Sequence, residues 1–324
     1  MKKLVILALF LILGLTGGWF GVIFYKNNQA KIEAAKIKPL EKYEFENLMK
    51  AEIPVSAIEV GNLLKDNGEF KSFEFSFKVD NKKVTGLINL PQKEGTFPLI
   101  IMFRGYVDQQ EYVIGEGTRN IGEVFAQNGY ITLAPDFLGY GNSDGESADI
   151  FESRFQTYTT VLTLIKSVES ISQWNKKDIF IWGHSNGGQI ALTVLELTGA
   201  DYPTVLWAPV SKPFPYSVLY YTDESDDHGK FIREKLAEFE KTYDVEKYSL
   251  TNYLNLIKAP LQLNQGTADD AVPYLWSDNL AKILKGNGAE IQYFKYPGAD
   301  HNLVPAWNLA VQRSLDFFKK NLKK

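Results

Sequence analysis

One serine in the sequence has the neighbours that nucleophilic chemistry requires. Ser185 lies in the sequence GHSNG (183–187), which fits the pattern G-x-S-x-G. The apolar, mostly β-branched and aromatic residues 179–182 predict a short buried strand, and the largely apolar residues 190–197 predict a buried helix. A serine on such a tight strand–helix turn has its hydroxyl lifted clear of the sheet, with the helix N-terminus facing any developing negative charge. Ser185 is therefore the candidate nucleophile.

A nucleophilic serine needs a base that accepts its proton and a carboxylate that orients the base. The chain has three histidines. His184 lies beside Ser185 on the turn and is expected to point away from it, and His228 lies in an acidic segment typical of a solvated surface. His301 follows a predicted strand end in the sequence YPGADH (296–301). We therefore expect His301 to be the base.

A second loop after a predicted strand carries candidate carboxylates. The sequence QGTADDAVP (265–273) follows the predicted strand that begins at Pro260, and it contains Asp269 and Asp270. The carboxyl ends of parallel strands lie at the same edge of a sheet. We therefore expect this loop, the His301 loop and the Ser185 turn to converge there.

The elements that position these residues alternate along most of the chain. Residues 73–79 alternate between apolar and polar side chains and lead through a turn at 80–81 into 84–90, which predicts a hairpin at a sheet edge. Further predicted strands are 99–103, 130–134, 179–182, 204–207, 260–264 and 291–296, and predicted helices are 118–128, 151–172, 190–197 and 305–322. This order predicts an α/β fold, a mostly parallel sheet with helices on both faces. The alternation stops at about 210–258, which we interpret as a small cap inserted over the strand ends.

The N-terminal segment has the length and composition of a membrane anchor. Leu4 to Tyr25 is a run of 22 residues without a charge, and a helix of that length reaches about 33 Å, enough to span a bilayer. Lys2 and Lys3 favour a cytoplasmic N-terminus with the bulk of the chain outside. We expect an uncleaved transmembrane anchor at 1–26, a charged stalk at 27–69 and a catalytic domain at 70–324. Small residues at 16–18 leave a cleaved signal peptide and secretion as the alternative.

Composition limits the other partners. The net charge of −4 provides no basic surface for nucleic acid. The chain has no cysteine, which excludes disulfides, thiolate catalysis and cysteine-ligated metals. Its three histidines are scattered, so we expect neither a metal site nor a cofactor. The sequence does not predict an oligomeric state.

The three loop motifs together resemble a known family. GHSNGG, QGTADDAVP and YPGADH, in this order, resemble the catalytic region of the prolyl oligopeptidase family of α/β-hydrolases and its dienelactone-hydrolase-like relatives. PDFLGYGNSDG (135–145) resembles their loop after the fourth strand. The resemblance covers roughly 71–320 and implies that Ser185 is the nucleophile, Asp269 the acid and His301 the base. Asp269 is favoured over Asp270 because it fits the family pattern G-x-x-D-x-x-V-P.

The same fold implies an oxyanion hole made by two backbone N–H groups, those of Asn186 after the nucleophile and Tyr106 after the third strand. The family usually has His-Gly in the latter loop, where this chain has Arg104 before a glycine. Arg104 is expected either to bind a substrate carboxylate or to form a structural salt bridge, with Asp136 as one possible partner. Gln265, where relatives often carry histidine, is a second departure and has no function predicted from the sequence.

These observations predict a membrane-anchored serine hydrolase that cleaves a carboxylic ester or similar acyl bond. A serine peptidase is the alternative, because the resembled family contains both activities. A non-catalytic ligand-binding protein is a third possibility, although such proteins typically lose a member of the triad. The short N-terminal segment and compact insert favour a small substrate, whereas the acidic run at 223–227 favours a cationic group such as a free amine.

Overall fold

The computed structural model describes residues 25–26, 38–222 and 225–323. The predicted membrane anchor therefore lies almost entirely outside the described residues. Within the described part of the chain, no helix combines the length and apolar character needed to cross a membrane. The chain divides into two units, 1–42 and 43–324, with the short 3-10 helix η1 (Glu41–Tyr43) at the boundary. The fold below is that of the second unit.

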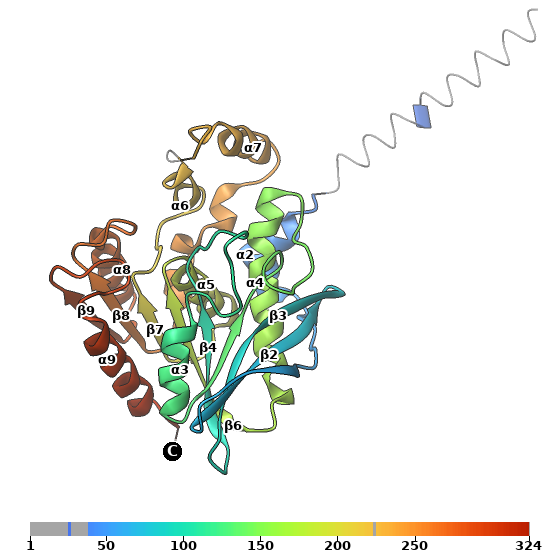
Figure 1. The fold of residues 1–324 in the computed structure, drawn as a ribbon. Helices are drawn as coiled ribbons and strands as arrows, with labels where there is room; N and C mark the ends of the chain where they lie inside the picture. Colours follow the sequence, from blue (N-terminus) through green and yellow to red (C-terminus); the bar gives the residue numbers. More distant parts are fainter. Residues whose placement is uncertain (1–24, 27–37, 223–224, 324) are drawn as a thin grey trace, which may run out of the picture. The chain divides into compact units, whose positions relative to one another are not determined.

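A single sheet organises the second unit (Figure 1), and in the described residues it has nine strands in the order β1-β2-β3-β5-β4-β6-β7-β8-β9. Strands β1, β2, β3 and β5 pair antiparallel, and every pair from β5 through β4 to β9 is parallel. The predicted mostly parallel sheet is thus confirmed. The strands are β1 (Glu59–Asp66), β2 (Phe70–Val79), β3 (Lys82–Pro91), β4 (Phe97–Phe103), β5 (Ile131–Pro135), β6 (Trp174–His184), β7 (Thr204–Trp207), β8 (Leu261–Gly266) and β9 (Ile291–Tyr296).

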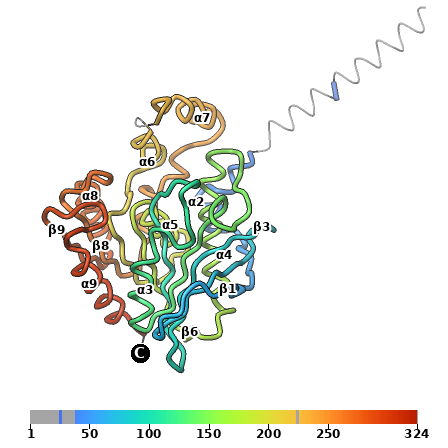
Figure 2. Tube along the Cα trace, in the orientation of Figure 1, coloured from blue at the N-terminus to red at the C-terminus, as the bar shows by residue number. Residues whose placement is uncertain are grey.

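Helices cover both faces of the sheet, as the alternation of side chains along β6 shows. Trp182 packs in a core cluster with α3 (Arg119–Gln127) and α9 (Trp307–Lys320). A Cβ on the next residue, Gly183, would instead meet the first turn of α5 (Asn186–Thr198). Successive strand residues point to opposite faces, so α5 covers the face opposite α3 and α9. Figure 2 shows α9 beside α3, although the two helices are far apart in the sequence.

Two further helices complete these layers. The long helix α4 (Ile150–Ser167), extended by η2 (Val168–Ser170), packs against α5. Asp149 caps α4, because its carboxylate accepts hydrogen bonds from the N–H groups of Phe151 and Glu152. Helix α8 (Tyr274–Gly286) packs against β8 and β9.

The residues before the predicted hairpin belong to the folded unit from residue 43 onward. Helix α2 (Phe45–Lys50) buries Phe45 completely, and the Phe45 ring stacks on Tyr253 at 4.7 Å between centroids. Strand β1 extends the sheet beyond β2. Over residues 43–69 the structure therefore differs from the stalk expected at 27–69. Two buried positions three residues apart, Phe45 and Leu48, are easily missed among charged neighbours.

Strand β1 is an irregular edge. All eight of its residues are exposed, and its register with β2 shifts twice, between Val60 and Leu63 and between Leu63 and Lys65. The ladder between β2 and β3, by contrast, is continuous over ten residues of each strand. The predicted hairpin is thus present, with β1 outside it.

An insert between β7 and β8 lies beyond the carboxyl ends of the strands (Figure 1). It contains α6 (Tyr216–Leu219), α7 (Lys230–Glu240) and the 3-10 helices η4 (Val245–Tyr248), η5 (Leu250–Asn252) and η6 (Leu254–Leu256). Aromatic rings fix it to α4, since Phe214 and Phe239 both pack against Phe151 and Phe155. This attachment places a compact, partly aromatic cap beside the loops that carry the candidate site.

Candidate active site

Ser185 occupies a strained turn between β6 and α5. Its backbone angles are φ 56° and ψ −120°, a conformation that a non-glycine residue rarely adopts. The Ser185 N–H donates to the carbonyl of Trp207 at 2.9 Å, and the Ser185 carbonyl accepts from the N–H of Val210 at 3.0 Å. The last residue of β7, Trp207, and Val210 in the loop after it therefore hold the turn in place through their backbone groups.

The glycines of the motif allow the turn to lie close to the neighbouring strand. A Cβ on Gly187 would collide with the backbone carbonyl of Phe103 at the end of β4. A Cβ on Gly183 would likewise collide with the Gly187 carbonyl, which it would approach to 2.5 Å. Only glycine leaves room for this approach, so the G-x-S-x-G spacing sets the start of α5 directly against β4.

His301 and Asp269 are in direct contact. Nδ1 of His301 lies 3.0 Å from Oδ1 and 2.9 Å from Oδ2 of Asp269. Oδ1 of Asp269 also accepts the N–H groups of Ala271 and Val272, at 3.0 and 2.7 Å. This arrangement uses Nδ1 of His301 and leaves Nε2 for a substrate or nucleophile. The neighbouring Asp270 is exposed.

The environment of Asp269 keeps its carboxylate charged. Burial by itself raises the pKa of Asp269, but hydrogen bonds from His301 and from the Val272 N–H outweigh burial and hold the pKa below its ordinary value. A charged carboxylate is what orients an imidazole and stabilises its protonated form. The pair is therefore electrostatically suited to general-base chemistry at neutral pH.

The Ser185 turn is linked to the His301 loop through His184. Nε2 of His184 lies 3.0 Å from the backbone carbonyl of His301, and the two ring centroids are 4.6 Å apart. The Ser185 hydroxyl itself makes no hydrogen bond within the described residues. The structure thus joins His301 and Asp269 directly and brings Ser185 to them through its neighbour. His184 also lines a separate cavity of about 630 Å³ with Trp182 and Trp207.

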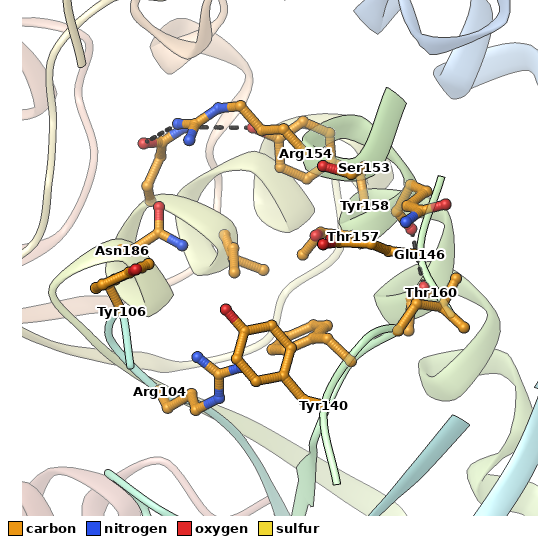
Figure 3. Close-up of a pocket in the computed structure, with 15 residues that line it drawn as sticks. Arg104, Tyr106, Tyr140, Glu146, Ser153, Arg154, Thr157, Tyr158, Thr160 and Asn186 are labelled. Atoms are coloured by element: carbon orange, nitrogen blue, oxygen red, sulfur yellow. Dashed lines mark hydrogen bonds between the residues drawn. The ribbon is translucent and has the colours of Figure 1, made fainter. Parts of the chain in front are cut away.

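The loop after β4 lies against Ser185. A Cβ on Gly105 would be 3.1 Å from the Ser185 Cβ. The next residue, Tyr106, and Asn186 at the start of α5 line one cavity of about 230 Å³ (Figure 3). Neither backbone N–H has a hydrogen-bond partner among the described residues. Two available N–H groups flanking a serine are the arrangement that an oxyanion requires.

Arg104 is held by backbone carbonyls rather than by a carboxylate. Its side chain is buried, and it donates to the carbonyls of Gly105 at 2.9 Å and Asp136 at 3.2 Å. The Asp136 carboxylate instead accepts hydrogen bonds from Thr85 and Tyr112, both shorter than 2.7 Å. The salt bridge to Asp136 considered from the sequence is therefore replaced by a contact with its main chain.

Gln265 donates a hydrogen bond to Asp269, a contact that the sequence did not predict. The residue is fully buried at the end of β8. Its Nε2 donates to Oδ2 of Asp269 at 2.8 Å, and its Oε1 accepts from the Ser277 hydroxyl at 2.7 Å. The available signal was a polar side chain four residues before Asp269, on a strand that is buried throughout and also carries Gln262 and Asn264.

The remaining histidine and possible metal ligands lie elsewhere. His228 is exposed in the insert. Among the described residues, no group of three or more His, Asp or Glu side chains is arranged to hold a metal ion.

Together these features define the class of protein. A mostly parallel sheet, a serine on a strand–helix turn, and an aspartate and a histidine on two later strand-end loops are the arrangement of an α/β-hydrolase of the serine hydrolase class. Residues 118–324 match the prolyl oligopeptidase family, and the chain belongs to that family. The resemblance inferred from the motifs is confirmed.

Known proteins of similar sequence and structure include esterases and a peptidase. An acetyl esterase, Axe7A of Xylanibacter ruminicola, is 22% identical over 261 residues, or 72% of this chain and 56% of Axe7A. The chain thus spans about half the length of this curated relative. Acetyl xylan esterase 1 of Thermoanaerobacterium aligns with a TM-score of 0.63 and 17% identity over 86% of this chain and 94% of its own.

Two more solved structures share the fold. Est1E of Butyrivibrio proteoclasticus, with ferulic acid bound, has a TM-score of 0.57 and 18% identity over 76% of this chain and 98% of its own. An acylaminoacyl peptidase of Pyrococcus horikoshii has a TM-score of 0.59 and 20% identity over 81% of this chain and 43% of its own. Because the fold accommodates both activities, the choice between them depends on the site.

Proposed function

We propose that the protein is an esterase that hydrolyses small carboxylic esters, with Ser185 as nucleophile, His301 as base and Asp269 as the orienting acid. The observation that carries this proposal is the cavity beside Tyr106 and Asn186 (Figure 3). Its volume of about 230 Å³ is below the roughly 300 Å³ at which sites for drug-sized ligands begin. Such a cavity fits a short acyl group.

The proposed reaction uses each group at a stated atom. Nε2 of His301 accepts the Ser185 hydroxyl proton as Oγ attacks the ester carbonyl carbon. The N–H groups of Asn186 and Tyr106 bind the resulting oxyanion. The intermediate collapses when His301 returns the proton to the departing alkoxide, which leaves as the alcohol. Water, deprotonated by His301, then hydrolyses the acyl-enzyme and releases the acid.

The alcohol portion of the substrate has an aromatic surface available to it. Tyr220 packs edge-on against Trp276 at 4.7 Å, and Tyr216 and Tyr221 lie at 6.1 and 6.5 Å from the same ring. Trp276 also packs with Val272 of the Asp269 turn. An aromatic wall on this side suits a sugar as the alcohol portion, so acetylated xylan, which joins a short acyl group to a sugar and is suggested by the relatives, is the first substrate to test.

Turnover measurements separate the esterase from the peptidase alternative. We expect the full-length protein in detergent to hydrolyse p-nitrophenyl acetate and butyrate with a kcat/KM at least tenfold higher than that for aminoacyl anilides. Amide cleavage asks more of His301, because an amine is a poorer leaving group that must be protonated. Equal or faster cleavage of the anilides would support the peptidase.

We also propose that the catalytic unit is anchored to the outer side of a membrane. The uncharged run from Leu4 to Tyr25, behind Lys2 and Lys3, supports this location. Protease treatment of intact cells should then remove the catalytic unit. Full protection would contradict the orientation, and a mature N-terminus near Gly17 would show a cleaved signal peptide instead.

A further inference from the structure

We propose that the acyl cavity selects esters whose acyl group ends in a carboxylate, that is, half-esters of short dicarboxylic acids. This inference rests on the esterase function proposed above and specifies its substrate class. Two arginines line the cavity, Arg104 and Arg154, and Figure 3 shows them on opposite sides of it, with Tyr106 and Asn186 between them at one end.

Arg104 brings a buried positive charge to the cavity without an ion-pair partner. Its side chain is only 6% exposed. Its hydrogen bonds go to the carbonyls of Gly105 and Asp136, and its buried Nε has no partner within the described chain. Carbonyl oxygens accept hydrogen bonds but do not neutralise a charge. The guanidinium also lies over the Tyr140 ring, 4.0 Å from its centroid, which fixes its plane.

Arg154 on α4 provides the second charge. It donates to the side-chain oxygen of Gln189 at 2.9 Å, and its buried Nε also has no partner in the described residues. No carboxylate of the described chain lies within ion-pair distance of either arginine. Arg154 is half-buried and Arg104 is buried, and a buried guanidinium without a carboxylate is unfavourable by itself. A ligand carboxylate between the two would form charge-assisted hydrogen bonds with both.

Among the described residues, one acidic side chain, Glu146, lines the cavity beside the two arginines. It is exposed at the rim, where it accepts a hydrogen bond from Gln109 at 2.8 Å. Asp136 does not line the cavity; burial raises the pKa of its carboxyl, while hydrogen bonds and the charge of Arg104 act in the opposite direction. Two guanidinium groups therefore face the cavity against one rim carboxylate.

The position of the catalytic residues assigns the cavity to the acyl side. The departing oxygen of the ester must lie near His301, because His301 protonates it. The cavity is lined by Tyr106 and Asn186, the neighbour of Ser185, whereas Ser185, His301 and Asp269 are not among its lining residues. The acyl group therefore extends from the carbonyl into the cavity, and a carboxylate at its far end reaches the arginines.

The test compares matched substrates with the full-length protein. Monoethyl succinate and monoethyl glutarate are measured against ethyl butyrate and ethyl valerate, in which a methyl group replaces the carboxylate. Butyryl glycolate, which carries its carboxylate on the alcohol, is the third arm. We expect the half-esters to have a kcat/KM at least tenfold above that of the neutral esters and of butyryl glycolate.

Variants of Arg154 then test the contact. Arg154→Met should lower the ratio of half-ester to neutral-ester kcat/KM at least tenfold, whereas Arg154→Lys, which keeps the charge, should retain most of it. Arg233→Met, on helix α7 and outside the lining of the cavity, is the matched control and should leave the ratio unchanged. Melting temperatures show whether each variant is folded.

The outcomes are separable. The inference would be overturned if the wild type preferred the neutral esters or butyryl glycolate. It would also be overturned if a folded Arg154→Met variant kept the wild-type ratio of half-ester to neutral-ester kcat/KM. Either result would leave the esterase function intact. If no ester were hydrolysed at all, the proposed function would fail, and the inference with it.

Discussion

The imidazole of His184 and the backbone carbonyl of His301 are joined by a hydrogen bond of 3.0 Å. Because the carbonyl can only accept, Nε2 of His184 carries the proton. The bond connects the turn that holds Ser185 to the loop that holds the candidate base. His184, which the sequence suggested would play no part in the chemistry, therefore couples the positions of the two residues.

The burial of His184 should make stability depend on pH. Burial, followed by the nearby His301, lowers the pKa of His184 to about 4 from 6.5. Between these values the unfolded chain binds a proton that the native state does not, so stability falls as pH drops from about 6.5 to 4. The loss should be on the order of 2–3 kcal/mol. Urea unfolding at pH 7 and 4.5 should show a smaller loss in His184→Gln than in the wild type.

Removal of the proposed nucleophile should abolish covalent labelling. Ser185→Ala keeps the Cβ and the backbone hydrogen bonds of the turn, so the variant should fold with a nearly unchanged melting temperature. It should no longer react with a fluorophosphonate probe. Continued labelling of a folded Ser185→Ala protein would place the nucleophile elsewhere.

The two adjacent aspartates should differ sharply in effect. Asp269 contacts His301, whereas Asp270 is exposed. Loss of the orienting carboxylate costs about 10⁴ in turnover in the reference serine-protease triad. Asp269→Asn should thus reduce kcat by several orders of magnitude, and Asp270→Asn, its matched control, by less than threefold. The reverse ranking in ester assays would contradict the assignment.

Gly187 should tolerate no side chain. In Gly187→Ala the new Cβ collides with the Phe103 carbonyl, which must move α5 away from β4 or unfold the turn. We expect at least 2 kcal/mol of destabilisation, in the range of other strained or overpacked sites. Gly286→Ala is the control, because its Cβ would meet open space at the end of α8. Thermal melts that ranked the two variants equally would argue against this packing.

Patterns of burial explain how much of this fold could be predicted from the sequence. The strands at 204–207 and 291–296 were predicted at their observed boundaries, because apolar runs between turn residues give a clear signal. Strand β1 has no buried face and therefore lacks the alternation that identifies a strand. Helix α2 was hidden because its two buried side chains lie among charged residues.

The sequence also predicted some residues of the candidate site and missed others. The loop motifs predicted that His301 and Asp269 lie together, and the structure places them in contact. The roles of Gln265 and His184 depend on contacts between loops that are distant in sequence. Such contacts arise only when the strands are assembled. The local sequence around Gln265 therefore does not predict that its amide lies 2.8 Å from the Asp269 carboxylate.

The irregular strand β1 also has a consequence for aggregation. Its two register shifts and exposed residues leave a poor template for a further strand, whereas β2 behind it offers ten residues in continuous register, with Phe73, Phe75 and Phe77 among them. Long regular edges pair readily with other chains. A chain shortened to begin at Phe70, where the sequence alone suggests the domain starts, would expose that edge. Light scattering should therefore show self-association of this shortened protein, while a chain beginning at Tyr43 stays dispersed.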